Sequence, residues 1–268
     1  GSTRLWNFRL TNILGGPRFA EDIFVVDNLA YVADSHDGLQ IVDVSNPSTP
    51  ILLGGIDTLG RAESVVVSGD TAYIAANGLW MVDVSDPAAP LAVSVFESVA
   101  AQVSVVGDLA YLTGEGLVIV DVTDPANPLE VGRLNDPSNS DGIFLQDELA
   151  YVVADGLHVI DVSDPTSPVE IGRLEVDAAM INSVVVSNGI AIVASSDGTV
   201  RSVDLSDAAS PMFVGKLDLD GEPMDMFWNG GLVYVAVLSD DEKTGGIQIV
   251  DVSDWPALTL VSVTDLGD

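Results

Sequence analysis

One short phrase recurs six times along this chain, and this repetition constrains the fold more than any other feature. Its third copy reads GLVIVDVTDPANP, from Gly116 to Pro128. An aspartate ends the apolar run in every copy. These six aspartates are Asp43, Asp83, Asp121, Asp161, Asp204 and Asp251. They recur about every 40 residues, a period that is typical of repeat architectures.

Each repeat contains four short runs with the composition of β-strands. In the second repeat the runs are AESVVVS, TAYIAA, LWMVDVS and LAVSVFES, beginning at Ala62, Thr71, Leu79 and Leu91. Val, Ile and Tyr fill the runs, and Gly, Asn, Asp and Pro separate them. No stretch keeps a helical period. Four antiparallel strands in each of six repeats predict an all-β fold, a six-bladed β-propeller.

The repeats predict a single propeller domain over residues 1–268. The expected blades lie at residues 20–57, 62–97, 101–134, 141–175, 179–218 and 222–264. A further extended run, RLWNFRLT at residues 4–11, precedes the first blade. Either this run supplies the outer strand of the last blade, or residues 258–264 do so and the first run adds a fifth strand. We expect the N-terminal strand to close the ring.

The repeat motif resembles that of a known family. The motif has the form A-Y-V-A-(D)-G-L-x-I-V-D-V-S-(D/N)-P-x-x-P, and it occurs at residues 31–50, 73–90, 111–128 and 151–168. It is similar to the LVIVD-repeat family, β-propellers of bacterial and archaeal surface or exported proteins. The fifth repeat departs from it, with Ile192 in place of the tyrosine and Ala208 in place of the first proline, and in the sixth repeat Trp255 shifts the last turn. The resemblance implies the fold and an extracellular or cell-surface location. It implies no particular activity, because the family has none generally assigned.

The chain is strongly acidic, with 9 Lys and Arg against 41 Asp and Glu and a net charge of −32. Such a surface repels nucleic acid and anionic membranes and attracts cations and basic partners. Abundant Asp with only two lysines resembles the surfaces of proteins from salt-rich environments, and bound Ca²⁺ is the rival explanation. We expect the thermal midpoint to rise as salt screens the repulsion. The chain has no cysteine, which excludes disulfides and thiolate chemistry.

Alignment of the repeats on their tyrosines brings oxygen-bearing side chains to one level, at the expected mouth of the central channel. The candidate ligands are Glu21, Glu63, Asp141, Asn182 and Asp225. Because Ca²⁺ takes 6 to 8 oxygen ligands, these side chains predict a Ca²⁺ site. By analogy of fold, six-bladed lactonases hold a catalytic Ca²⁺ in this location. A hydrated pore without metal is the other interpretation, and no catalytic residue is assigned.

Two acidic loops between second and third strands are expected to face a partner. The candidate residues are Asp34, His36, Asp37, Asp240, Asp241 and Glu242. The buried-strand residue His158 is instead expected to pack between blades. The leading hypothesis is a non-enzymatic binding or scaffold module that presents an acidic loop face to a protein or other surface component. The alternatives are a Ca²⁺-dependent hydrolase or lactonase, and a structural part of a surface layer or larger polyprotein.

Overall fold

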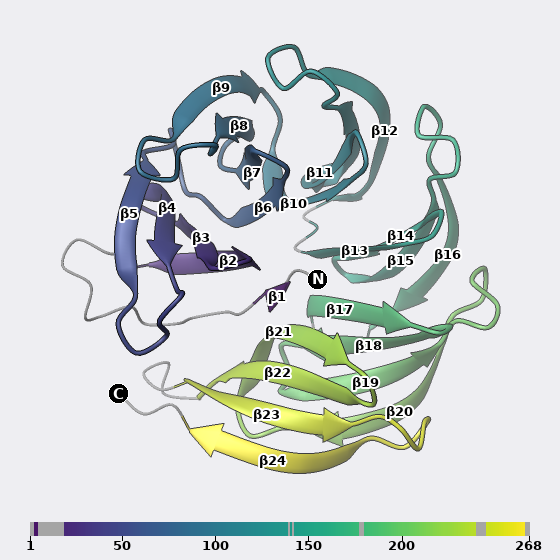
Figure 1. Ribbon diagram of the computed structural model, residues 1–268. Coiled ribbons are helices and arrows are strands. Elements are labelled where there is room, and N and C mark those ends of the chain that lie inside the picture. Colours follow the sequence, from purple (N-terminus) through teal and green to yellow (C-terminus); the bar gives the residue numbers. More distant parts are fainter. Residues whose placement is uncertain are drawn as a thin grey trace. The chain divides into compact units, whose positions relative to one another are not determined.

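The computed structural model describes residues 3–4, 19–138, 140, 142–176, 180–239 and 245–265. The regular structure of these residues is entirely β-strand, arranged in six antiparallel sheets of one repeat each (Figure 1). The predicted all-β fold with six blades is therefore confirmed. The chain divides into two compact units, Gly1–Asn135 and Asp136–Asp268. None of the described residues form a helix with the length and apolar character needed to cross a membrane.

The first unit contains three sheets. The first sheet has the order β1 (Thr3–Arg4), β2 (Ala20–Val26), β3 (Leu29–Asp34), β4 (Gly38–Asp43), β5 (Ile51–Ile56). The second consists of β6 (Ser64–Ser68), β7 (Thr71–Ala75), β8 (Leu79–Asp83) and β9 (Leu91–Phe96). The third consists of β10 (Ala100–Val106), β11 (Leu109–Asp121) and β12 (Leu129–Ser138). Gly114 and Gly116, with φ of +147° and +91°, mark a turn inside β11, whose halves correspond to the second and third strands of the other blades.

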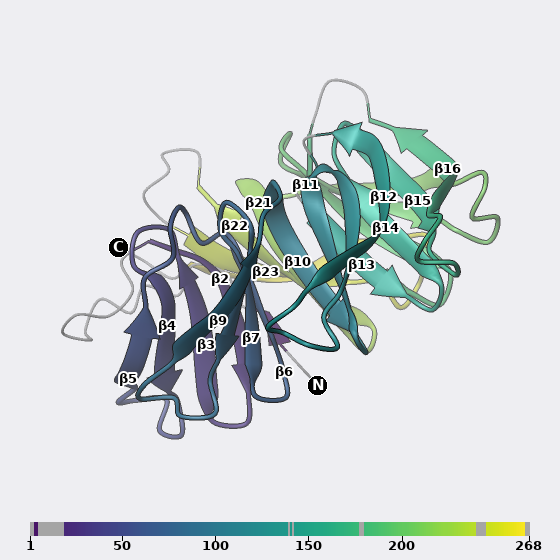
Figure 2. The same ribbon diagram turned by 90° about the horizontal axis from the view of Figure 1, so that it is seen from above.

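The second unit contains three four-stranded sheets in sequence order. The first consists of β13 (Gly142–Gln146), β14 (Leu149–Val153), β15 (Gly156–Asp161) and β16 (Val169–Glu175) (Figure 2). The next consists of β17 (Ile181–Ser187), β18 (Ile190–Ser195), β19 (Thr199–Asp204) and β20 (Met212–Asp218). The last consists of β21 (Glu222–Asn229), β22 (Leu232–Leu238), β23 (Gly245–Asp251) and β24 (Thr259–Asp265).

The prediction that residues 4–11 close the last blade is wrong. The outer strand of the last sheet is β24, which pairs with β23 from Asp251↔Thr259 onwards. Arg4 instead pairs with Phe24, so that β1 is a fifth strand on the inner edge of the first sheet. The physical reason is proximity along the chain, since a short turn brings β24 back onto β23 and consecutive strands tend to pair. Residues 5–11 lie outside the described part of the chain.

The apolar core lies between neighbouring sheets within each unit. In the first unit Leu39 and Ile41 of β4 are fully buried, and they belong to one cluster with Ala72 and Ile74 of β7. In the second unit, β15 packs in the same way into a cluster with β17 and β18. In both of these clusters the third strand of the blade is buried against the neighbouring sheet. Each blade supplies half of a core that the next blade completes.

The acidic and proline-rich end of the repeated phrase forms a double turn. In the third repeat, Asp121 Oδ1 accepts a hydrogen bond from the Thr123 amide at 2.9 Å, and Asp124 Oδ1 accepts one from the Ala126 amide at 3.0 Å. The first of these bonds recurs at all six blade aspartates, on Ser45, Ser85, Thr123, Ser163, Ser206 and Ser253. Asp and Asn favour such turns because their side chains bond the backbone two residues ahead.

The same turn lies against the outer strand of the preceding blade, at a small residue just after a β-bulge. Ser94 Oγ donates a hydrogen bond to the carbonyl oxygen of Pro125 at 2.6 Å. A Cβ atom on Gly172 would lie only 2.1 Å from the carbonyl oxygen of Ala208. An added Cβ atom on Gly54 would likewise lie 2.7 Å from the Pro87 carbonyl oxygen, and one on Gly215 would clash with the Pro256 carbonyl oxygen. The phrase therefore joins neighbouring blades within each unit as well as reversing the chain.

The blade aspartates predict a loss of stability in acid. Hydrogen bonds from the side chain and amide of Thr123 lower the pKa of Asp121 below its ordinary value, and the pKa of Asp83 is lowered similarly by Ser85. A pKa that is lower in the folded state stabilises the fold above the unfolded-state pKa, and this contribution is lost as pH falls through the folded pKa. We therefore expect stability to fall below about pH 4.

Asp121→Ala tests this assignment. At pH 7 the variant should melt at a lower temperature than the parent, because the turn has lost its acceptor. The difference should narrow in acid, where the parent carboxylate is protonated and its bonds weaken. Circular dichroism melts of both proteins from pH 7 to pH 3 measure the effect. A difference that does not change with pH would contradict an ionised acceptor at this position.

Candidate functional site

Two of the candidate ligand residues, Glu21 and Asn182, lie at β-bulges near the start of the innermost strands. Glu21 is the extra residue between Ala20 and Asp22 of β2, and Asn182 is the extra residue between Ile181 and Ser183 of β17. A bulge places consecutive side chains in new directions. As a result, Asp22 is 1% exposed, whereas the Glu21 side chain remains 30% exposed. The sequence alignment placed Glu21 and Asn182 at equivalent positions near the start of their strands. It did not predict the bulges.

Asp22 connects the blades of the first unit rather than lying open to a ligand. Its Oδ1 accepts a hydrogen bond from the Ile23 amide at 2.8 Å. Its Oδ2 accepts bonds from Ser64 Oγ at 2.9 Å and from the Val65 amide at 3.0 Å. Ser64 Oγ in turn accepts a bond from the Val103 amide at 3.4 Å. The innermost strands β2, β6 and β10 are thereby linked through one buried carboxylate.

Glu21 and Glu63, two of the predicted Ca²⁺ ligands, bind an arginine of the chain itself. Arg61 Nη2 donates to Glu21 Oε1 at 2.8 Å, and Arg61 Nε lies 4.0 Å from Glu63 Oε1. Glu21 Oε1 also accepts a bond from Ser35 Oγ at 2.6 Å. The hydrogen bond to Glu21 raises the pKa of Arg61. Sequence reasoning missed Arg61, although a basic residue two positions before Glu63 in so acidic a chain was a usable signal.

The other candidate ligands lie in the second unit. Asn182 Nδ2 donates to Glu222 Oε1 at 3.2 Å and to the Pro223 carbonyl oxygen at 2.9 Å. Asp225 Oδ1 accepts a bond from Ser183 Oγ at 2.8 Å. Asp141 lies outside the described residues. Within the described residues, no group of three or more His, Cys, Asp or Glu side chains could hold a metal ion. The Ca²⁺ site stays a prediction.

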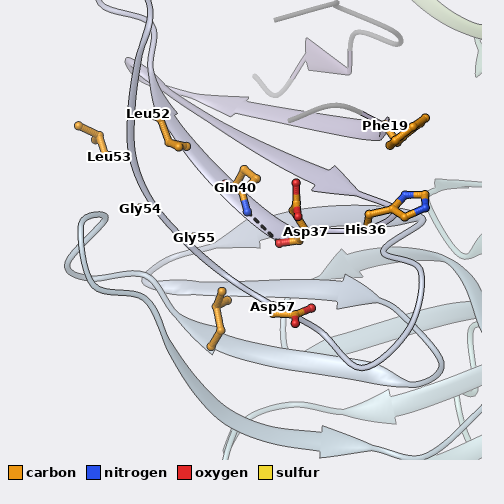
Figure 3. A pocket seen from close by; sticks show the side chains of 10 residues that line it. Phe19, His36, Asp37, Gln40, Leu52, Leu53, Gly54, Gly55 and Asp57 are labelled. Atoms are coloured by element: carbon orange, nitrogen blue, oxygen red, sulfur yellow. Dashed lines mark hydrogen bonds between the residues drawn. The ribbon is translucent and has the colours of Figure 1, made fainter. Parts of the chain in front are cut away.

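The predicted partner-facing loop of the first blade borders a hollow of about 760 Å³ (Figure 3). Asp240, Asp241 and Glu242, the other loop residues predicted to face a partner, lie outside the described part of the chain. The side chains that matter for the chemistry of the hollow are Phe19, His36, Asp37, Gln40 and Asp57, with Gly55 on the outer strand. The Phe19 and His36 rings lie 4.5 Å apart at an interplanar angle of 41°. The hollow thus combines aromatic rings with two carboxylates and an amide.

Asp34 supports this loop from inside the protein. It is fully buried, so it does not face outwards as the sequence suggested. Its Oδ2 accepts a bond from the Phe19 amide at 3.0 Å. Its Oδ1 accepts bonds from the amides of His36 at 2.9 Å and Asp37 at 3.0 Å. One carboxylate therefore fixes the backbone of three residues that line the hollow.

His158 is fully buried on β15, as expected for a packed residue, and both of its ring nitrogens contact carboxylates. Nδ1 lies 2.8 Å from Glu170 Oε2, and Nε2 lies 3.1 Å from Asp155 Oδ1. Asp155 Oδ2 also accepts a bond from Arg173 Nη2 at 2.8 Å. The hydrogen bond with His158, followed by the charge of Arg173, lowers the pKa of Asp155. This acidic loop residue is therefore bonded to a histidine and an arginine of its own blade.

Six antiparallel sheets, each built from one copy of the same repeat, define the class of this protein as a six-bladed β-propeller. The LVIVD repeat model matches six times, at residues 17–58, 59–97, 99–136, 138–176, 179–218 and 220–265. The chain belongs to the LVIVD repeat family. No curated protein was found to match it.

Several solved structures share the fold at 12% sequence identity. A functionally unknown protein from Desulfotomaculum acetoxidans DSM 771 has a TM-score of 0.72, with 94% of this chain and 87% of that chain covered. A hypothetical selenium-binding protein from Sulfolobus tokodaii has a TM-score of 0.67, with coverages of 90% and 76%. The computationally designed Ika8 protein has a TM-score of 0.65, with coverages of 90% and 73%. At this identity the similarity establishes the fold alone.

Proposed function

We propose that this propeller is a non-enzymatic binding or scaffold module that presents acidic loops to a basic partner. The observation that carries the proposal is the hollow beside Asp37 and Asp57 in a chain of net charge −32. Neither carboxylate has a hydrogen bond or ion pair with another described side chain, and both residues are exposed. Binding sites commonly lie on loops that a rigid scaffold holds in place.

The arrangement around Arg61 favours a binding module over a Ca²⁺-dependent hydrolase. A catalytic Ca²⁺ would need oxygen ligands that are free to coordinate it. Glu21 is instead bonded to Arg61 and Ser35, and Asp225 is bonded to Ser183. A cation would have to compete with the Arg61 guanidinium for the Glu21 carboxylate, and a hydrogen bond from Ser183 already occupies one oxygen of Asp225.

A comparison of the two ends of the blades tests the proposed function. The loops between second and third strands lie at one end of each blade, and the turns between first and second strands lie at the other. A labelled hexalysine peptide should bind the parent protein. Its affinity should fall as NaCl screens the charges. A loop-end variant with three acids neutralised should bind more weakly than a turn-end variant with the same charge. The loop-end set is Asp37→Asn, Asp57→Asn and Glu115→Gln, and the turn-end set is Asp27→Asn, Asp70→Asn and Asp108→Asn.

Fluorescence anisotropy titrations measure both variants. Equal affinities of the two variants would mean that the peptide responds to net charge alone. That result would contradict a defined binding face.

A further inference from the structure

Two blades of the second unit show how this chain binds a guanidinium group at the loop between its second and third strands. In the fourth blade, Asp155 Oδ2 accepts a hydrogen bond from Arg173 Nη2 at 2.8 Å. In the fifth blade, Asp197 Oδ2 accepts one from Arg201 Nη2. The Arg201 guanidinium also lies over the Phe213 ring, 5.9 Å from its centroid. Both blades thus combine a loop aspartate with a guanidinium, and the fifth blade adds an aromatic ring.

Asp37 occupies in the first blade the position that Asp155 occupies in the fourth. It directly precedes Gly38 at the start of β4, as Asp155 precedes Gly156 at the start of β15. Asp197 of the fifth blade lies in the same loop, but one residue further from its strand, since β19 begins at Thr199. Pairing registers fix the equivalence of the positions around it. Gln40 pairs with Gly55, whereas His158 pairs with Arg173 and Arg201 pairs with Lys216.

The first blade therefore lacks the cations that its relatives carry. Gly55 stands where the fourth blade has Arg173, and neutral Gln40 stands where the fifth has Arg201. The Gln40 amide donates to the backbone carbonyl oxygen of Asp37 at 2.8 Å, which leaves the carboxylate unbonded within the described structure (Figure 3). The Gln40 amide also fills the space beside Gly55, where an added Cβ atom would lie 2.7 Å from Gln40 Nε2. The Asp37 residue itself remains exposed at the hollow.

The remaining side chains of the hollow suit a planar cation. Phe19 is 56% exposed, and its ring lies 4.5 Å from the His36 ring, so the rest of the ring is accessible to a stacking partner. Asp57 adds a second carboxylate from the end of the outer strand. A guanidinium can stack its flat face on an aromatic ring while the N–H groups at its edge bond a carboxylate. An ammonium is instead a compact, strongly hydrated charge.

We propose that this hollow binds the guanidinium group of an arginine side chain on a partner peptide. This proposal rests on the proposed function and names the group that the acidic face recognises. Asp37 and Asp57 bind the guanidinium, Phe19 stacks against it, and Asp34 holds the loop in position. The role of Asp37 follows from the Asp155–Arg173 contact, and that of Asp34 from its bonds to the loop amides. The roles of Asp57 and Phe19 follow from their positions at the hollow.

The test uses the full chain and the peptide acetyl-Gly-Arg-Gly-amide. Its controls carry lysine or citrulline in place of arginine, and citrulline has nearly the same shape without the charge. In ¹H–¹⁵N NMR titrations, the arginine peptide should shift the amide signals of Phe19, His36 and Asp37. The citrulline peptide should leave them unchanged, and the lysine peptide should bind more weakly. Free arginine amide should bind like the peptide if the side chain alone is recognised.

Two matched variants decide whether the hollow is responsible. Asp37→Asn should weaken binding of the arginine peptide about tenfold, equivalent to about 1.4 kcal/mol. Asp70→Asn removes the same charge at the other end of the blades and should change the affinity less than about twofold, by less than 0.5 kcal/mol. Equal effects of the two variants, or equal binding of the citrulline peptide, would overturn the guanidinium site.

The hexalysine titration separates failure of this site from failure of the proposed function. If hexalysine still prefers the loop end while the arginine and citrulline peptides bind alike, the acidic face stands and the guanidinium pocket is wrong. If hexalysine shows no preference between the two ends, the proposed function itself is wrong.

Discussion

Asp22→Ala is expected to lower the free energy of unfolding by about 3 kcal/mol, because each buried donor left without its partner costs about 1–3 kcal/mol. The carboxylate is 1% exposed and accepts bonds from the Val65 amide and Ser64 Oγ of the next blade. Both donors lie in fully buried residues. Urea unfolding followed by tryptophan fluorescence measures the loss.

Two further variants make the Asp22 result specific. Asp22→Asn keeps a side-chain oxygen that can accept one of the bonds, so it should retain part of the stability. Asp70→Ala, at an exposed hairpin turn, should change stability by no more than about 0.5 kcal/mol. Hydrogen exchange at the Val65 amide should accelerate in Asp22→Ala beyond the global change in stability. Equal unfolding energies for Asp22→Ala and Asp70→Ala would refute the connecting role of Asp22.

Gly172→Ala is expected to cost about 1–3 kcal/mol, the usual range for forcing an extra carbon into a filled space. The added Cβ would lie 2.1 Å from the Ala208 carbonyl oxygen and 3.1 Å from the Ala208 carbonyl carbon and Ala209 Cα. These are backbone atoms, so relief requires the turn of the fifth repeat to move away from β16. The expected result is a lower urea midpoint, with the turn displaced from its neighbour.

Gly245→Ala is the matched control for this substitution. Gly245 also lies in a strand of the second unit and has no positive φ, but its added Cβ would come no closer than 3.5 Å to Val237 O. Its cost should stay within about 0.5 kcal/mol. If both alanine variants lost the same stability, the contact between turn and outer strand would have no special role.

The sequence was sufficient for the class of fold because its signals are local and repeated. The apolar run from Leu117 to Val120 predicts a buried strand, and all four of its residues are buried. The Asp121 and Asp124 side chains bond amides only two residues ahead, so their turn can be predicted from adjacent residues. Six copies of such a unit leave few folds other than a propeller.

The candidate site could be predicted only in part. Alignment brought Glu21 and Glu63 to the same level of the blades, and Arg61 indeed contacts both. It did not reveal that Arg61 lies between them, because the alignment compares equivalent positions and Arg61 lies in the connection between two blades. Asp34 and Asp37 lie in the same short loop, yet one is fully buried and the other is exposed.

By itself, the sequence determined where strands and turns form, because those interactions join residues a few positions apart. Only the tertiary structure decided which carboxylates have a cation. Glu21 meets Arg61 across 40 positions, and Asp155 meets Arg173 across 18. It also decided that β24, rather than the N-terminal run, forms the outer strand of the last sheet. Such pairings depend on which side chains the packing of strands brings within a few ångströms. They leave Asp37 without an arginine, whereas its equivalent in the fourth blade, Asp155, binds Arg173.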